Sequence, residues 1–331
     1  MTSSTTVRGP YFDELVVGTT FASAPAVTLT EGMQAVHHSI VGNRIRLLLD
    51  HELARRVTGR RPLASPGLVW DISIGQSTAA TQFVRANLFY RGLWFHRVPE
   101  VGDTLHTTTR VEALKQNSVK PQRPPTGMAV LQISTIDQAG RRVLDYRRCA
   151  MLPLGPGSAP TGHQDPLGAA GDLALEELLV PSADWDLSPI RELPGKHFAD
   201  LAPGMAWEVD GMDVVTGAPD LARLTGNIAK VHHDQRAAGG RRLVYGGHTI
   251  GLALHHLTRA LPNVVTVAGW HGCDHHGPVH EGDSLRSVVE VESLHPLEGG
   301  GGLASLKVST FAAADPEDRA VLAYRPVVVF A

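Results

Sequence analysis

An internal repeat is the feature that most constrains how this chain can fold. Four blocks of similar sequence occur twice, in the same order, at offsets that short insertions can explain. The pairs are FDELVVG (12–18) with FADLAPG (198–204), GNRIRLLLD (42–50) with GNIAKVHHD (226–234), GDTLHTTTRVEAL (102–114) with GDSLRSVVEVESL (282–294), and VLQIST then VLDYRR (130–148) with SLKVST then VLAYRP (305–326). Asn43 and Asn227 lie 184 residues apart, and Gly102 and Gly282 lie 180 apart. We interpret the pattern as a duplicated domain.

The segment between the copies has the composition of a linker. PLGPGSAPTGHQDPLGAAGD, at 153–172, is rich in Pro, Gly and Ala and has no hydrophobic period. We therefore expect an N-terminal lobe at residues 8–153, a linker at 154–196 and a C-terminal lobe at 197–331. The total length of 331 residues suits two lobes of ordinary size.

Each copy has the same succession of predicted elements. A long apolar stretch, at 67–85 in one copy and 247–261 in the other, predicts a helix buried on several sides. Alternating runs rich in Thr and Val follow and predict antiparallel strands. A buried helix followed by such a sheet indicates an α+β lobe in which the sheet wraps the helix, the hot-dog arrangement. The predicted fold is thus a double hot-dog, two tandem lobes in one chain.

Charge and cysteine content exclude several classes of function. The net charge is −3 and no run of five like charges occurs, so neither nucleic acid nor a membrane surface is an expected partner. No stretch approaches the ~20 apolar residues of a membrane span. The N-terminus lacks the apolar core of a signal peptide. With only Cys149 and Cys273, no disulfide framework is expected, and the cytoplasm is the expected location.

The two copies differ at a position suited to chemistry. His232 lies in GNIAKVHHD where the matching residue of GNRIRLLLD is Leu48. Histidine titrates near neutral pH, whereas leucine cannot exchange protons. This asymmetry is typical of a duplicated enzyme in which one lobe keeps the active site and the other becomes a substrate-binding wall. The alternative is that His232 is a partly buried loop histidine with no chemical role.

Around these residues the sequence resembles a known family. GNIAKVHHD, VYGGHTIG and GDSL resemble the MaoC-like, (R)-specific enoyl-CoA hydratases. The chain is more similar still to the two-lobed mesaconyl-CoA hydratases, also called methylmalyl-CoA dehydratases, through YFDELVVGTTF, NLFYRG, VGDTLHTTTRVEALKQN and GGRRLVYGGHTIGLAL. The resemblance covers about two thirds of the chain and omits the linker and the segment at 297–304.

The resemblance implies a site and a mechanism. In the general family an Asp and a His five residues apart hold a water against the double bond of an enoyl thioester. Here the histidine corresponds to His232 and the Asp position is Asn227, which can orient water but cannot act as a base. His232 would then be the main acid–base group, an effect worth roughly 10²–10⁴ in rate. Asp234 is expected to steady the loop or to orient a histidine.

The family also places a backbone N–H of the buried helix against the thioester carbonyl. Glycines at a helix start allow close approach, and the free N–H groups and dipole there favour an oxyanion-like carbonyl. We expect Gly247 to supply this contact, with Gly246, Tyr245 and His248 lining the pocket. Alternatively, the two glycines only form a tight turn into the helix.

Two further segments have alternative interpretations. The histidine-rich segment HGCDHHGPVH (271–280) matches no usual zinc spacing, so we expect neither a metal nor a cofactor, although His275 or His276 could contact substrate. The block RVTGRRP (56–62) could contact CoA phosphates, but such residues more often form a solvated face.

Three functions compete on the sequence alone. The first is a hydro-lyase that adds water to, or removes it from, a small, branched or carboxylated acyl-CoA. The second is a thioesterase, against which Asn227 argues because a thioesterase normally needs a carboxylate. The third is a non-catalytic acyl-binding module. A biosynthetic dehydratase acting on a carrier-bound or free acid also remains open. The expected partner is an acyl-CoA or other acyl-thioester, and a homo-oligomer is compatible with the sequence.

Overall fold

The structure is a computed structural model that describes residues 4–60, 62–119, 123–168 and 171–331. These residues form one twelve-stranded antiparallel sheet. The strands of the N-terminal half are β1 (Thr20–Phe21), β2 (Val27–Thr28), β3 (Ala86–Phe95), β4 (Thr104–Gln116), β5 (Thr126–Ile136) and β6 (Arg142–Pro153). The strands of the C-terminal half are β7 (Ala206–Glu208), β8 (Asp213–Val214), β9 (Val264–His275), β10 (Ser284–Pro296), β11 (Gly302–Ala312) and β12 (Arg319–Phe330).

Helices are fewer and shorter than strands. The α-helices are α1 (Glu31–Val41), α2 (Arg46–Leu49), α3 (His51–Thr58), α4 (Pro66–Gln76), α5 (Ser188–Arg191), α6 (Ala218–Leu224) and α7 (Gly246–Ala260). The 3-10 helices are η1 (Phe12–Glu14), η2 (Ser77–Ala80), η3 (Leu175–Glu177), η4 (Phe198–Asp200) and η5 (Lys230–His232). Among the residues that the structure describes, no helix combines the length and apolar character needed to cross a bilayer.

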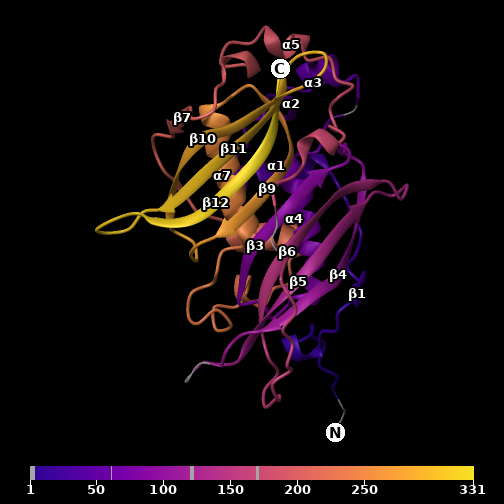
Figure 1. The fold of residues 1–331 in the computed structure, drawn as a ribbon, viewed down its shortest axis with the longest axis vertical. Helices are drawn as coiled ribbons and strands as arrows, with labels where there is room; N and C mark the ends of the chain where they lie inside the picture. The colour runs from indigo at the N-terminus through magenta and orange to yellow at the C-terminus, as the bar shows by residue number, and fades with distance from the viewer. Residues whose placement is uncertain (1–3, 61, 120–122, 169–170) are drawn as a thin grey trace.

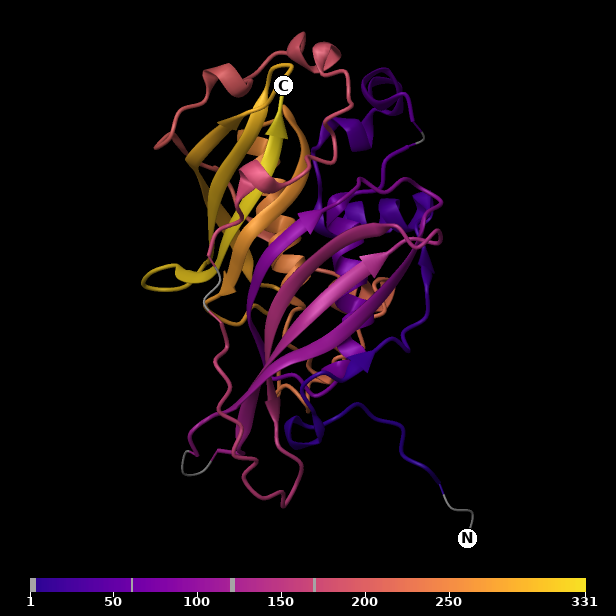
Figure 2. The same cartoon turned by 45° about the vertical axis from the view of Figure 1, so that its right-hand side comes forward.

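The two halves of the sheet mirror one another across a central seam. The strand order is β1-β4-β5-β6-β3 in one half and β9-β12-β11-β10-β7 in the other, and β3 pairs with β9. Figures 1 and 2 show that each half-sheet curls around a helix of its own. Each half is therefore a hot-dog lobe, and the chain has the double hot-dog fold predicted from its repeat.

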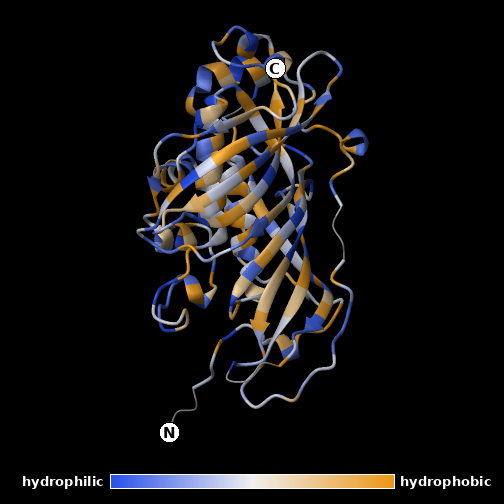
Figure 3. Ribbon diagram, turned by 60° about the vertical axis from the view of Figure 1, so that its left-hand side comes forward, coloured by the Kyte–Doolittle hydropathy of each residue, from blue (hydrophilic) through white to orange (hydrophobic). Residues whose placement is uncertain are grey.

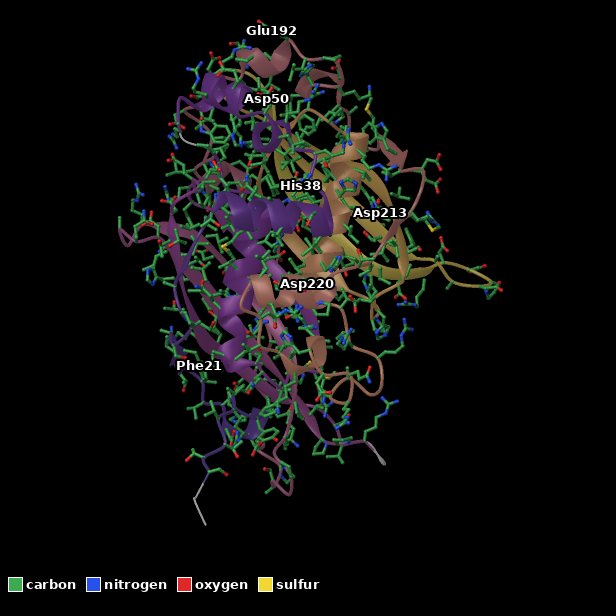
Figure 4. All side chains as sticks on the ribbon, turned by 180° about the vertical axis from the view of Figure 1, so that it is seen from behind. Phe21, His38, Asp50, Glu192, Asp213 and Asp220 are labelled. Atoms are coloured by element: carbon green, nitrogen blue, oxygen red, sulfur yellow. The ribbon has the colours of Figure 1, made fainter. Side chains whose placement is uncertain are left out.

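The central helices α4 and α7 are buried by the sheet and by each other. Every residue of α4 is buried, and α7 is buried along most of its length. Seen from behind in Figure 4, the helices lie in front of the two half-sheets, where α1 and α6 contact one another. The hydropathy colouring of Figure 3 alternates along the long strands, because successive side chains face opposite sides of a sheet. The core thus lies between the sheet and the two helices.

The helix predicted at 67–85 ends earlier than its apolar pattern suggested. α4 stops at Gln76 and continues only as η2 to Ala80. The hydroxyls of Ser77 and Thr78 donate to carbonyls three residues earlier, at 2.6 and 2.5 Å, which competes with regular helix. Residues 66–80 nevertheless match α7, residues 246–260, at the same 180-residue offset as the flanking strands.

The segment between the lobes lies along the outer face of the sheet. β6 ends at Pro153 and η4 begins at Phe198. Within this stretch Asp165 accepts from the Leu114 amide at 2.9 Å, and Leu167 packs on Ala113, Val130 and Cys149. Further along, Asp172 forms an ion pair with Arg325 of β12. These contacts attach the connecting segment to both half-sheets.

Candidate active site

A cavity of about 320 Å³ opens where the two lobes meet. The N-terminal lobe contributes the end of α4, η2 and the strands β3 and β6 to its wall. The C-terminal lobe contributes the loop before α7, the first turn of α7 and the end of β9. Its polar lining consists of Thr78, Arg85, Asn87, Tyr90, Arg148, Asn227, His232, Tyr245, Thr249, His275 and His276. No Asp or Glu among the described residues lines the cavity.

His232 is held in this wall in one tautomer. Its Nδ1 lies 2.8 Å from the carbonyl oxygen of Leu243, so Nδ1 carries the hydrogen and Nε2 keeps a lone pair. Burial lowers the pKa of His232 to about 4, and the charge of Arg148 adds to the effect. The Leu243 carbonyl acts in the opposite direction but is outweighed. At neutral pH, His232 is therefore an uncharged acceptor.

Asn227 is partly committed to the turn that carries His232. Its Oδ1 accepts from the Ala229 amide at 3.0 Å, and its own carbonyl accepts from His233 Nε2 at 2.6 Å. The repeat partner Asn43 makes the same turn, with Oδ1 accepting from Ile45 at 2.9 Å. The Asn shared by both copies therefore has a structural role in each.

The remaining donor of Asn227 distinguishes the two copies. Asn43 Nδ2 donates to Ser65 at 3.2 Å, whereas Tyr245 occupies the position of Ser65 in the C-terminal copy. Within the described residues, Asn227 Nδ2 has no acceptor, and Asn227 lines the cavity. This N–H group is thus available to a water or substrate.

The N-terminal lobe keeps a second cavity at the repeat-related place. This cavity of about 280 Å³ is lined by Asn43, Leu48 and Ser65, among others. The surrounding backbone is repeated as well, since Ile228 N donates to Thr78 at 3.0 Å and Arg44 N donates to Thr258 at 3.3 Å. In the second cavity Leu48 stands at the position of His232, and the titratable lining residues are Glu31, His37, His38 and His51.

The start of α7 corrects one expectation about the glycines. Gly246 lines the cavity, and Gly247 does not. A Cβ on Gly247 would lie 2.0 Å from Asp71 Oδ1, so this position is glycine because of core packing. A Cβ on Gly246 would lie 2.8 Å from His275 Nε2, on the cavity side. Of the two glycines, Gly246 is therefore the one that lines the cavity.

Tyr245 joins the cavity wall to a buried polar chain. Its hydroxyl donates to Asp71 Oδ1 at 3.2 Å, and Asp71 Oδ2 lies 3.0 Å from His37 Nε2. Burial raises the pKa of Tyr245, so the phenol stays protonated and acts as the donor. The ring centroid of Tyr245 lies 5.7 Å from that of His232. The contact with Asp71 of the N-terminal lobe thus holds the Tyr245 ring beside His232.

His248 was predicted to line the pocket, but it is not among the residues that line the cavity. The side chain is fully buried away from the cavity, and neither ring nitrogen has a hydrogen-bond partner in the described structure. Burial lowers its pKa to about 4. Its repeat counterpart is Leu68, which is also buried. His248 occupies a core position.

The histidine-rich segment does not converge on one point. His271 contacts Ser305, and His280 donates to the carbonyl of Arg242, both with separations below 3 Å. Of its histidines, His275 and His276 line the cavity, together with Gly277, Pro278 and Val279 of the same segment. In the described ranges of the chain, no three His, Cys, Asp or Glu side chains are grouped to hold a metal.

Asp234 and the described residues of the block 56–62 lie outside the cavity. Asp234 accepts from the Arg236 amide at 2.8 Å in an exposed turn, which is a structural contact. In the block 56–62, Arg56 and Arg60 form ion pairs with Glu192 and Asp184, and neither lines the cavity. Arg61 lies outside the described residues.

Sequence reasoning missed Arg148 and Tyr90, which the N-terminal lobe contributes to the cavity. A signal for Arg148 was present in the repeat. VLDYRR ends in Arg148 where VLAYRP ends in Pro326, although the preceding Tyr and Arg are the same in both. This difference parallels that between His232 and Leu48.

Comparison with known proteins returns relatives of one kind. The chain is 30% identical to mesaconyl-CoA hydratase of Cereibacter sphaeroides over 295 residues, covering 86% of this chain and 84% of that protein. It is 28% identical to β-methylmalyl-CoA dehydratase of Chloroflexus aurantiacus, covering 95% of this chain and 90% of that protein. A scan against protein-family models gives no match.

Solved structures agree in fold along nearly the whole chain. Rv0216 of Mycobacterium tuberculosis, described as a double hot-dog, is 51% identical, with a TM-score of 0.91 over 97% of this chain and 98% of that one. A MaoC-domain dehydratase of Chloroflexus aurantiacus is 23% identical, with a TM-score of 0.84 over 99% of both chains. The second likeness concerns the fold alone.

Proposed function

This chain belongs to the MaoC-like family of hydratases and dehydratases, which are hydro-lyases, and we propose that it acts on a small, branched or carboxylated acyl-CoA at the cavity around His232. Water is added across, or removed to form, the double bond between Cα and Cβ. The substrate class is suggested by the names of the relatives, mesaconyl-CoA hydratase and β-methylmalyl-CoA dehydratase.

The observation that carries this proposal is the fixed tautomer of His232. Because Nδ1 donates its hydrogen to the Leu243 carbonyl, Nε2 carries a lone pair. The lowered pKa of His232 keeps Nε2 unprotonated at neutral pH. In hydration, Nε2 takes a proton from water while the water oxygen bonds to Cβ. The electron pair of the double bond moves toward the thioester oxygen. The imidazolium then returns the proton to Cα, which completes the net addition of one water.

The first turn of α7 supports stabilisation of the developing negative charge. The first amides of a helix have no acceptor within the helix, and the dipole there favours an anion. Gly246 begins α7 and lines the cavity. We assign the contact with the thioester oxygen to its amide, a type of interaction that removes several kcal/mol from acyl-transfer barriers, typically ~3.

Asn227 has a supporting part in this scheme. Its Oδ1 accepts the hydrogen bond from the Ala229 amide within the turn, whereas Nδ2 can still donate to a group in the cavity. We assign Nδ2 to orient the attacking water. Water positioned by an amide and deprotonated by an imidazole needs no carboxylate in the site.

A second groove, which shares part of the cavity wall, is evidence in favour of CoA as the carrier. Val84, Arg85 and Val231 line both, and the groove continues past Phe83 and Lys230. Arg85 is exposed, and the Lys230 ammonium lies 4.6 Å from the centre of the Phe83 ring. Cations at this mouth suit the phosphates of CoA.

The experiment is to incubate the protein with a panel of 3-hydroxyacyl- and 2-enoyl-CoAs, mesaconyl-CoA included, and to follow the acyl mass. A change by one water, without release of the CoA thiol, is the expected result. Release of free thiol would indicate a thioesterase instead. Thioesters that bind to the protein but keep their mass would indicate an acyl-binding module. Free acids and carrier-bound acyl groups, run in parallel, test the remaining carriers.

A further inference from the structure

We infer that Arg148 selects acyl groups that bear a second, free carboxylate, by forming an ion pair with that carboxylate inside the cavity. The inference rests on the proposed function, because it concerns the acyl part of the same substrate. It adds a specificity-determining residue that lies in the N-terminal lobe, opposite the lobe that carries His232.

Arg148 is a buried cation without an anionic partner. It lies on β6, lines the cavity and is only 3% exposed. One terminal nitrogen, Nη2, donates to the Ser77 carbonyl at 3.2 Å and to Thr81 Oγ1 at 2.5 Å. Nε has no hydrogen-bond partner, and no carboxylate of the described residues forms an ion pair with this side chain. Both neighbours are neutral, so the charge is not compensated.

A charge in this state calls for an anion. Burial of an ionised group is costly unless it is paired and hydrogen-bonded. A guanidinium presents several N–H groups in a planar fork that matches the two oxygens of a carboxylate. The cavity offers no Asp or Glu of its own, and its other titratable lining residues are Arg85, Tyr90, His232, Tyr245, His275 and His276. A carboxylate brought by the substrate is therefore the ligand that fits.

The position of Arg148 separates this role from binding of CoA phosphates. Arg85 is exposed at the mouth, where the carrier would leave, whereas Arg148 is buried. Arg148 is also near enough to His232 for its charge to contribute to the lowered pKa of that histidine. An anion on Arg148 would thus lie near the reacting carbons, as a carboxylate of a small acyl group does.

The repeat gives independent support. Arg147 and its counterpart Arg325 form equivalent ion pairs on the outer face, with Glu112 and Glu292. The next residue is Arg148 in one copy and Pro326 in the other. The structural ion pair is therefore kept in both lobes, while the inward-facing Arg occurs only in the copy that faces the His232 cavity.

The test compares two substrates that differ only at the proposed contact. Mesaconyl-CoA carries the carboxylate, and 2-methylcrotonyl-CoA has a methyl group in its place. We expect the wild type to prefer mesaconyl-CoA in kcat/KM. Arg148→Gln should lose roughly 10²-fold or more on mesaconyl-CoA, as for other buried charge pairs, and its loss on 2-methylcrotonyl-CoA should be much smaller. Arg147→Gln, on the same strand but the outer face, is the matched control and should keep the preference.

Each other outcome has a definite meaning. Equal losses on both substrates would show that Arg148 only supports Ser77 and Thr81, and would overturn the inference. A wild type that prefers 2-methylcrotonyl-CoA would also overturn it, yet would leave the hydro-lyase proposal intact. A wild type that hydrates neither would contradict the proposed function for these substrates.

A binding measurement tests Arg148 without turnover. Titration calorimetry with free mesaconate should detect binding to the wild type and to Arg147→Gln, and a loss of binding in Arg148→Gln. Unchanged binding in Arg148→Gln would overturn the inference. If Arg148→Gln does not fold, Arg148→Lys replaces it, because it keeps the charge and loses the fork. This variant should then retain part of the affinity for mesaconate, and full wild-type affinity and selectivity would contradict the assigned fork.

Discussion

The neighbours of His232 set its protonation state. The Leu243 carbonyl fixes the hydrogen on Nδ1, and burial keeps the ring neutral, with a pKa of about 4. His233 closes the same loop by donating to the carbonyl of Asn227. The nitrogen that we propose as the base is thus determined by backbone contacts that no comparison of the two blocks could predict.

Asn227→Asp tests how His232 responds to charge. A carboxylate at this position would favour the imidazolium and raise the pKa of His232 by about one to three units. The base-limited arm of the kcat/KM profile should therefore move from near pH 4 to higher pH. The measurement is kcat/KM against pH for wild type and variant.

The turn itself should survive this change, because an Asp oxygen can accept from Ala229 as Asn227 Oδ1 does. Asn227→Ala removes that acceptor and is expected to slow turnover through the loop as well as through the water. An unshifted profile in Asn227→Asp would remove this pair from the mechanism.

Site residues were predictable where the copies could be compared and less so elsewhere. The difference between His232 and Leu48 pointed to a position that lines the cavity at the junction of the lobes. At the start of α7 the sequence alone does not indicate which residue faces the cavity, because successive helix residues point about 100° apart. Gly246 therefore faces the cavity while Gly247 faces Asp71, and His248 enters the core.

At the scale of elements, the two central helices are held together by polar contacts as well as by packing. Tyr245, just before α7, donates to Asp71 of α4, which also contacts His37 of α1. These three side chains are buried. Local periodicity predicted both helices, but it could not predict this link or the change to 3-10 helix after Gln76, which depend on hydroxyl contacts.

Tyr245→Phe should weaken the link between the helices. It leaves one buried oxygen of Asp71 without its donor, which costs about 1–3 kcal/mol in the free energy of unfolding. Denaturant unfolding measures this change. Tyr324→Phe is the matched control, because the buried Tyr324 hydroxyl has no partner within the described structure, and its loss should cost little. Equal effects of the two substitutions would show that the hydroxyl of Tyr245 contributes nothing specific.

At the scale of the molecule, the continuous sheet makes the two lobes one unit. β3 and β9 approach so closely that a Cβ on Gly269 would lie 2.2 Å from the Leu93 carbonyl oxygen. The His232 cavity takes its walls from both sides of this junction. The repeat predicted two similar lobes, but pairing between β3 and β9 arises from contacts distant in sequence and could not be predicted from either copy.

Acid should destabilise the whole molecule through its buried histidines. His232, His248 and His275 each have a folded-state pKa of about 4, below the ordinary value of 6.5, because burial disfavours their charged forms. Between pH 4 and pH 6.5 the unfolded chain binds more protons than the folded protein. The contribution of these histidines to the free energy of unfolding is therefore fully present above pH 6.5 and is lost as the pH drops toward 4. The measurement is Tm across this range.

His248→Leu, which installs the residue found at Leu68, should reduce that dependence on pH and leave activity near wild type. The cavity does not involve this side chain, so loss of turnover in a folded His248→Leu protein would contradict its assignment to the core. An unchanged slope of Tm against pH would mean that His248 is not the source of acid sensitivity.

The central claim is that each chain has one working site, in the C-terminal lobe at the junction of the two. Its most direct test is kcat for hydration of the best enoyl-CoA by His232→Ala and by Leu48→Ala, the same position in the two copies. We predict a loss of roughly 10²–10⁴ in His232→Ala with the fold intact, and a value near wild type in Leu48→Ala. Normal turnover by His232→Ala, or its abolition in a folded Leu48→Ala protein, would contradict the claim.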